Sequence, residues 1–164
     1  MNEEISDAIV ESVQDIVNGL LAMEVSHGVR HAETSLEILE SVEGLSVIQE
    51  ISAVVGFTGA LRGAILLQGS ITTALQLVGA LVGRPLESLN SESLELVGEL
   101  ADLIAGGMRS RLSSHGALSM TPPMVVVGSR YSLHNARIFC RSRHFFQVPG
   151  GSFIVECQYL KDSA

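Results

Sequence analysis

The chain has 164 residues, of which 46% are hydrophobic and only 17% are charged, a composition that favours one domain with a full core and excludes a disordered tail. The net charge of −8 argues against a general nucleic-acid binder, because phosphate binding needs clustered cations. The sequence contains no run of about 18 apolar residues and its first residues are acidic, so we expect no membrane span, no signal peptide and a cytoplasmic location.

Apolar residues at helical spacing predict a first helix over residues 4–24, followed by a polar connection over residues 26–35. Residues 36–46 fit either a short helix or an edge strand. His27 and His31 are spaced i, i+4, which can place two imidazoles on one helix face, but no typical third metal ligand stands nearby. We therefore predict no metal site.

The next segment predicts a β-hairpin followed by a helix. Residues 47–57 and 61–69 are rich in aliphatic side chains and form the two strands. Ser70 is a favourable N-cap for a helix over residues 71–83, which Arg84-Pro85 ends. The glycines of this region lack the spacing of a nucleotide-binding loop, so no cofactor is predicted for this chain.

A long amphipathic helix begins at Asn90 or Ser91 and extends to about residue 114. Gly116 is a plausible stop. The apolar side of this helix comprises Leu96, Val97, Leu100, Leu103, Ile104, Met108 and Leu112.

Three strands follow: one that is entered through a Pro-Pro turn within residues 119–128, and two over residues 136–148 and 152–160. Pro122 and Pro123 must lie at the start of the first strand or outside its ladder. Cys140 and Cys157 are too few for a disulfide framework, and we interpret them as buried free thiols.

The elements predict an α+β fold, a two-layer arrangement in which helices pack on a mostly antiparallel sheet, and residues 1–164 form one domain. Arg137, Arg141 and Arg143 alternate along a strand, which favours an exposed, charged strand face over an anion site. We place His115 and His144 at the surface or in loops.

A column of residues lies opposite the apolar side of the long helix. Glu95, Glu99, Asp102 and Gly106 step by four, three and four positions. Acids at this spacing repel one another, and each interior glycine costs about 0.5–1 kcal/mol relative to alanine. A solvated face explains the acids but not the glycines. A docking face with a bare patch at Gly106 and Gly107 explains both.

The segment LELVGELADLIAGGMRSRLSSHG…SMTPPMVVVG resembles the signature helix and following strand of the CheX-type chemotaxis phosphatases, the family that includes CheC and FliY. The family carries an E-x-x-N pair on this helix, a glycine two turns from the Glu and a proline before the next strand. Here Glu99 stands at the Glu position, Gly106 just beyond the glycine region and Pro122-Pro123 at the proline. The segment VVGFTGALRGAILLQGSITTALQLVGALVG resembles the family's preceding strand, turn, strand and helix.

The resemblance implies hydrolysis of the aspartyl phosphate on a phosphorylated CheY-like receiver, in chemotaxis or two-component signalling. The receiver holds the phosphoaspartate, a Mg²⁺ ion and a lysine. Glu99 pairs with that lysine, and position 102 orients a water in line with the acyl phosphate. Glu95 and Gly106 are docking residues. The resemblance also implies a homodimer that pairs sheet edges.

Position 102 departs from the family pattern, because it is Asp where the family has Asn. An amide accepts and donates hydrogen bonds, whereas an ionised carboxylate only accepts and adds negative charge beside the phosphoryl group. Asp102 can still orient a water or take its proton. Three interpretations stay open: a phosphatase, a CheX-like module that binds a receiver or another signalling partner without hydrolysis, or a dimeric scaffold that keeps the fold and has lost the site.

Overall fold

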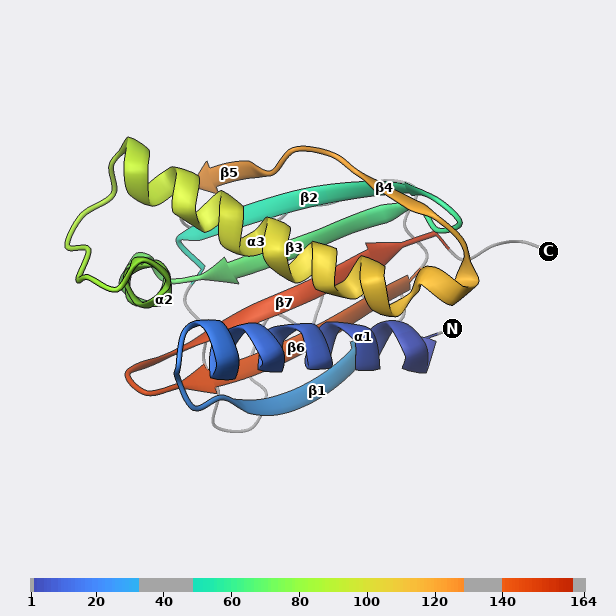
Figure 1. Cartoon of the computed structure of the whole chain (residues 1–164), viewed down its shortest axis with the longest axis horizontal. Helices are drawn as coiled ribbons and strands as arrows, with labels where there is room; N and C mark the ends of the chain where they lie inside the picture. The colour runs from blue at the N-terminus through green and yellow to red at the C-terminus, as the bar shows by residue number, and fades with distance from the viewer. Residues whose placement is uncertain (1, 33–48, 129–139, 161–164) are drawn as a thin grey trace.

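The computed structural model describes residues 2–32, 49–128 and 140–160 (Figure 1). Its helical elements are α1 (Asn2–Gln14), the π-helical turn η1 (Asp15–Leu20), α2 (Ile71–Val82), α3 (Ser91–Arg111) and the 3-10 turn η2 (Ser113–His115). Its strands are β1 (Ser26–Ala32), β2 (Ile51–Gly59), β3 (Gly63–Gly69), β4 (Leu118–Met120), β5 (Met124–Val127), β6 (Cys140–Val148) and β7 (Gly151–Tyr159).

All the strands belong to one antiparallel sheet in the order β1-β6-β7-β3-β2, with β4 and β5 both pairing the outer side of β2. Helices α1 and α3 lie side by side across one face of the sheet, and α2 lies at one end of α3 (Figure 1). The predicted α+β fold with a mostly antiparallel sheet and a helical layer is confirmed.

Several predicted elements are confirmed with small shifts at their ends. The first helix is present as α1 and η1, and the hairpin as β2 and β3. The Ser70 hydroxyl accepts a hydrogen bond of 3.0 Å from the Thr73 amide at the start of α2. Gly83 ends α2 at a φ of 74°, a left-handed conformation that favours glycine. The ambiguous residues 36–46 lie outside the described part of the chain.

The prediction of a polar connection over residues 26–35 is wrong, because Ser26–Ala32 form strand β1. This strand is polar in sequence, and its hydrogen bonds come from pairing with β6, from Ser26 opposite Gln147 to Ala32 opposite Arg141. Local sequence cannot report such a long-range partner. His27 and His31 therefore lie on a strand and do not share a helix face.

The strand predicted to follow a Pro-Pro turn within residues 119–128 is present as β5, and a further short strand, β4, precedes the prolines. Proline lacks the amide hydrogen that a ladder needs, so Pro122 and Pro123 separate the two strands. Thr121 instead bonds to Gly56 of β2 through both its backbone amide, at 2.8 Å, and its hydroxyl, at 2.9 Å. These bonds hold the proline segment against the sheet.

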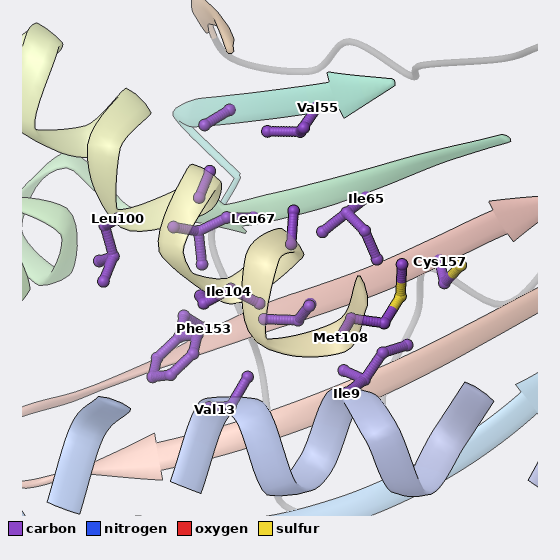
Figure 2. Close-up of a cluster of buried hydrophobic side chains, with 14 of the residues drawn as sticks. Ile9, Val13, Val55, Ile65, Leu67, Leu100, Ile104, Met108, Phe153 and Cys157 are labelled. Carbon is purple, nitrogen blue, oxygen red and sulfur yellow. The ribbon is translucent and has the colours of Figure 1, made fainter. Parts of the chain in front are cut away.

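The core lies between the helical layer and the sheet (Figure 2). Alternate residues of each central strand point toward the helices and are buried, as in Ala53, Val55 and Phe57 of β2. Figure 2 shows Ile9 and Val13 of α1 meeting side chains of α3 and the strands in one cluster, which includes Ile65, Leu67, Leu100, Ile104, Met108, Phe153 and Cys157. Both cysteines are buried free thiols, as predicted.

Helices α1 and α3 approach closely at Gly107. A Cβ at this position would overlap the Ser12 hydroxyl, which donates a 2.8 Å hydrogen bond to the Ile104 carbonyl. Farther along, the Arg111 guanidinium bonds to the carboxylates of Glu11 of α1 and Asp15 of η1. The contact thus fixes α3 relative to α1.

Gly107→Ala should destabilise the protein by about 1–3 kcal/mol, because the added methyl group forces the two helices apart. Gly106→Ala is the matched control, since a Cβ there would meet nothing within 4 Å. It should stabilise the fold by about 0.5–1 kcal/mol through helix propensity. Urea unfolding of both variants measures the difference, and equal effects would contradict this account of Gly107.

The structure corrects the surface placement of His144, which is fully buried. Its ring nitrogens make hydrogen bonds of 2.9 Å to His27 and 2.8 Å to the Ser142 hydroxyl, which lies 2.8 Å from the Ser6 hydroxyl of α1. A buried polar side chain is tolerated where every polar atom has a partner. The four side chains form a polar chain between α1, β1 and β6 that the sequence did not reveal.

Burial lowers the pKa of His27 below the usual 6.5. Below pH 6.5 the unfolded chain therefore binds more protons at this residue than the folded chain does. The contribution of His27 is fully present above pH 6.5 and is lost as the pH falls toward the lower, folded-state pKa. The free energy of unfolding should decrease less between pH 7.5 and pH 5.5 in His27→Gln than in wild type, as urea titrations would measure. An equal decrease would contradict the assignment.

The exposed charged face predicted for Arg141 and Arg143 is wrong for Arg143, which is 8% exposed. Its guanidinium donates at 2.8 and 2.6 Å to the buried carboxylate of Glu156, its partner across β6 and β7. Gln158 donates to the same carboxylate at 2.6 Å. The cross-strand partner, absent from any local pattern, allows this arginine to be buried. Arg137 lies outside the described residues.

Candidate functional site

Helix α3 begins with a capping box. The Asn90 side chain accepts a hydrogen bond of 2.9 Å from the Ser93 amide, and the Ser93 hydroxyl accepts one of 2.8 Å from the Asn90 amide. This reciprocal pair satisfies two amides that the first turn leaves unpaired. The choice left open in the sequence between Asn90 and Ser91 is decided for Asn90.

The structure places Glu95, Glu99 and Asp102 on the exposed side of α3, opposite the side that packs on the sheet. Glu99 and Asp102 lie about 4.5 Å apart along the helix axis. Within the described residues, none of the three carboxylates has an ion-pair or hydrogen-bond partner. The column therefore presents accumulated negative charge to solvent.

Helix α3 contains three glycines, Gly98, Gly106 and Gly107. Only Gly106 leaves open space beside the acids, because an added Cβ there would meet nothing within 4 Å. Gly107 faces Ser12 of α1, which corrects its assignment to the bare patch. Gly98 is buried, and a Cβ there would lie 3.3 Å from Pro123. Two of the three glycines thus serve packing within the chain.

The sequence pattern places Leu103 on the apolar side of α3, but in the structure Leu103 is 42% exposed. It follows Glu99 by four positions and Asp102 by one, so it flanks the acidic pair. The buried side is completed by Leu100, Ile104 and Met108 without it. The narrower buried stripe in the structure leaves an apolar side chain beside the acids.

Glu99 and Asp102 lie on an exposed surface of α3 and do not line either of two open hollows in the described structure. These hollows lie elsewhere, one beside α2 that is lined by Gln76, Gly79 and Arg84, and one near Asn18 and Gln147. Within the described residues, no group of three His, Cys, Asp or Glu side chains could hold a metal ion. A convex face with unpaired acids can bind a cationic group and orient a water, but the reacting group must come in a partner's own cleft.

No helix in the described residues is long and apolar enough to cross a membrane.

The fold is that of the CheC-like proteins. A CheC-like superfamily protein from Shewanella sp. PV-4 superposes with a TM-score of 0.82 at 20% identity, covering 98% of this chain and 100% of that one. A chain of the CheX–CheY–BeF3–Mg²⁺ complex from Borrelia burgdorferi superposes with a TM-score of 0.74 at 21% identity. The match covers 94% of this chain and 97% of that one.

Residues 51–147 match the family described as "Chemotaxis phosphatase CheX". The protein belongs to this family, which confirms the resemblance found in the sequence. The CheY-P phosphatase CheX of Thermotoga maritima is 29% identical over 130 residues, which are 78% of each chain.

Proposed function

We propose that this protein is a phosphatase that hydrolyses the aspartyl phosphate of a CheY-like receiver domain in chemotaxis or two-component signalling. The proposal rests on the carboxylates of Glu99 and Asp102, which face outward on the signature helix of a CheX-family fold. Neither has an ion-pair or hydrogen-bond partner among the described residues. A convex face suits a macromolecular substrate that brings its own phosphoryl group and cleft.

In this proposal α3 lies along the receiver, and the Glu99 carboxylate accepts a hydrogen bond from the receiver's lysine. Gly106 lets the partner approach the helix backbone, and Glu95 adds a contact one turn before Glu99. The receiver supplies the Mg²⁺ ion, and this chain needs no cofactor of its own. The protein would act in the cytoplasm, as a homodimer; cell fractionation and sedimentation velocity test these two expectations.

Asp102 acts on water. Its carboxylate accepts a hydrogen bond from a water molecule and holds the oxygen in line with the phosphorus. The water oxygen forms a bond to phosphorus as the bond to the aspartyl oxygen breaks, and the products are inorganic phosphate and a free aspartate on the receiver. The receiver's Mg²⁺ and lysine offset part of the repulsion between Asp102 and the phosphoryl group.

Phosphate release from a phosphorylated CheY-type receiver of the same organism, with Mg²⁺, tests the proposal. Wild type should accelerate release over the receiver alone. Glu99→Gln should lose at least about tenfold of that acceleration, because a neutral amide binds the lysine less strongly than a carboxylate does. Asp102→Asn should be at least as fast as wild type, because the amide keeps an acceptor for water and removes one negative charge.

Glu3→Gln is the matched control, since Glu3 is an exposed acid on α1, away from the column. If wild type is inactive and Asp102→Asn is active, the native chain is the non-catalytic binding module, an alternative that the Asp at position 102 favours. If Glu99→Gln equals wild type, the site assignment is wrong. A much slower Asp102→Asn would assign proton transfer to the carboxylate.

Leu103→Gln should weaken binding of the receiver about fivefold to tenfold, because covering an exposed leucine in an interface contributes on the order of 1 kcal/mol. Leu20→Gln is the matched control, because Leu20 is 54% exposed on η1. Titration calorimetry with the receiver measures both affinities. Equal affinities of the two variants would remove Leu103 from the docking face.

A further inference from the structure

One cation continues the acidic column of α3. Arg109 follows Gly106 by three positions and Asp102 by seven, so it lies on the same exposed side of the helix, two turns beyond Asp102. The axial separation of residues 102 and 109 is about 10.5 Å. A basic side chain in the last turns of a helix is common and by itself indicates no site.

Arg109 differs from the other arginines that belong to α3 or contact it. Arg111 is held by Glu11 and Asp15, and Arg84 pairs with Glu92. Within the described part of the chain, Arg109 has neither an ion-pair nor a hydrogen-bond partner for its side chain. Its guanidinium is therefore available to a partner.

The space between Arg109 and Asp102 is open. Side chains on a helix lean toward its N-terminus, so the long side chain of Arg109 can reach over the turn that contains Gly106. A Cβ on Gly106 would meet nothing within 4 Å. The Ser110 hydroxyl is turned onto the Gly106 carbonyl at 3.1 Å and does not project into this space. A group bound over Gly106 can contact Asp102 on one side and Arg109 on the other.

The charges of the surrounding side chains indicate which chemical group can bind over Gly106. Glu95, Glu99 and Asp102 would repel a phosphoryl group that approached them, and Arg109 is the unpaired cation in their column. A guanidinium presents a planar fork of donors that matches the oxygens of a phosphoryl group. On one side of the helix, Asp102 can therefore hold the attacking water and Arg109 can bind the negatively charged oxygens of the phosphoryl group.

We infer that Arg109 is a further contact residue for the substrate, which donates hydrogen bonds to oxygens of the receiver's phosphoryl group across Gly106 and offsets the charge of Asp102. This inference rests on the proposed function. Through Arg109, the site would bind the phosphorylated receiver more tightly than the unphosphorylated one.

Binding to a receiver with and without Mg²⁺ and beryllofluoride, which stands in for the phosphoryl group, tests the inference. Wild type should prefer the loaded receiver. Arg109→Gln should reduce that preference at least tenfold while its affinity for the unloaded receiver stays unchanged, whereas a general docking charge would affect both forms. Arg109→Lys should restore part of the preference, because it keeps the charge but not the planar fork.

Arg62→Gln is the matched control, because Arg62 is another exposed arginine, placed between β2 and β3, without an ion pair to the described residues. It should bind as wild type does. A preference that is unchanged in Arg109→Gln, or that is absent in wild type, overturns the inference. Phosphate release, measured in parallel, separates the two proposals: an inactive wild type overturns the phosphatase activity, whereas the binding preference alone decides the role of Arg109.

Discussion

The orientation of α3 about its own axis is the constraint on which the site depends. Leu100, Ile104 and Met108 are at most 2% exposed and lie in the core between α1 and the sheet. Rotating the helix by half a turn would expose these side chains and bury the acidic pair without partners. Burying an uncompensated carboxylate costs several kcal/mol. The hydrophobic side of the helix thereby determines the direction in which its polar side points.

The contact between α1 and α3 makes that orientation rigid. Gly107 allows the helices to touch, and the Ser12 hydroxyl bonds to the Ile104 carbonyl. Arg111 adds ion pairs to Glu11 of α1 and Asp15 of η1. A site on packed helices keeps its side chains within a narrow range of positions, which is what orienting a water for in-line attack requires. The fold therefore contributes to the proposed chemistry chiefly by positioning.

Charges in this protein fall into two groups. Some are compensated within the chain, as in the buried pair of Arg143 and Glu156 and in the surface bonds of Arg111. Glu95, Glu99, Asp102 and Arg109 on the exposed side of α3 have no such compensation among the described residues. Repulsion between acids on one helix face costs a few tenths of a kcal/mol per pair. The fold tolerates this cost, and a partner with the opposite charge would remove it.

The element types and their order along most of the chain follow from sequence, because hydrophobic periodicity, Ser70, Asn90 and the prolines act through neighbours a few residues away. The acidic column on α3 also follows from spacing alone, as does the family resemblance. Strand β1 and the burial of His144 do not, since each depends on a strand far away in sequence, and the burial of Arg143 depends on Glu156 of the neighbouring strand. The roles of the glycines on α3 also depend on tertiary contacts. Helical spacing places Gly98, Gly106 and Gly107 on α3, but only the structure shows that Gly98 packs on Pro123 and Gly107 on Ser12, while Gly106 stays open.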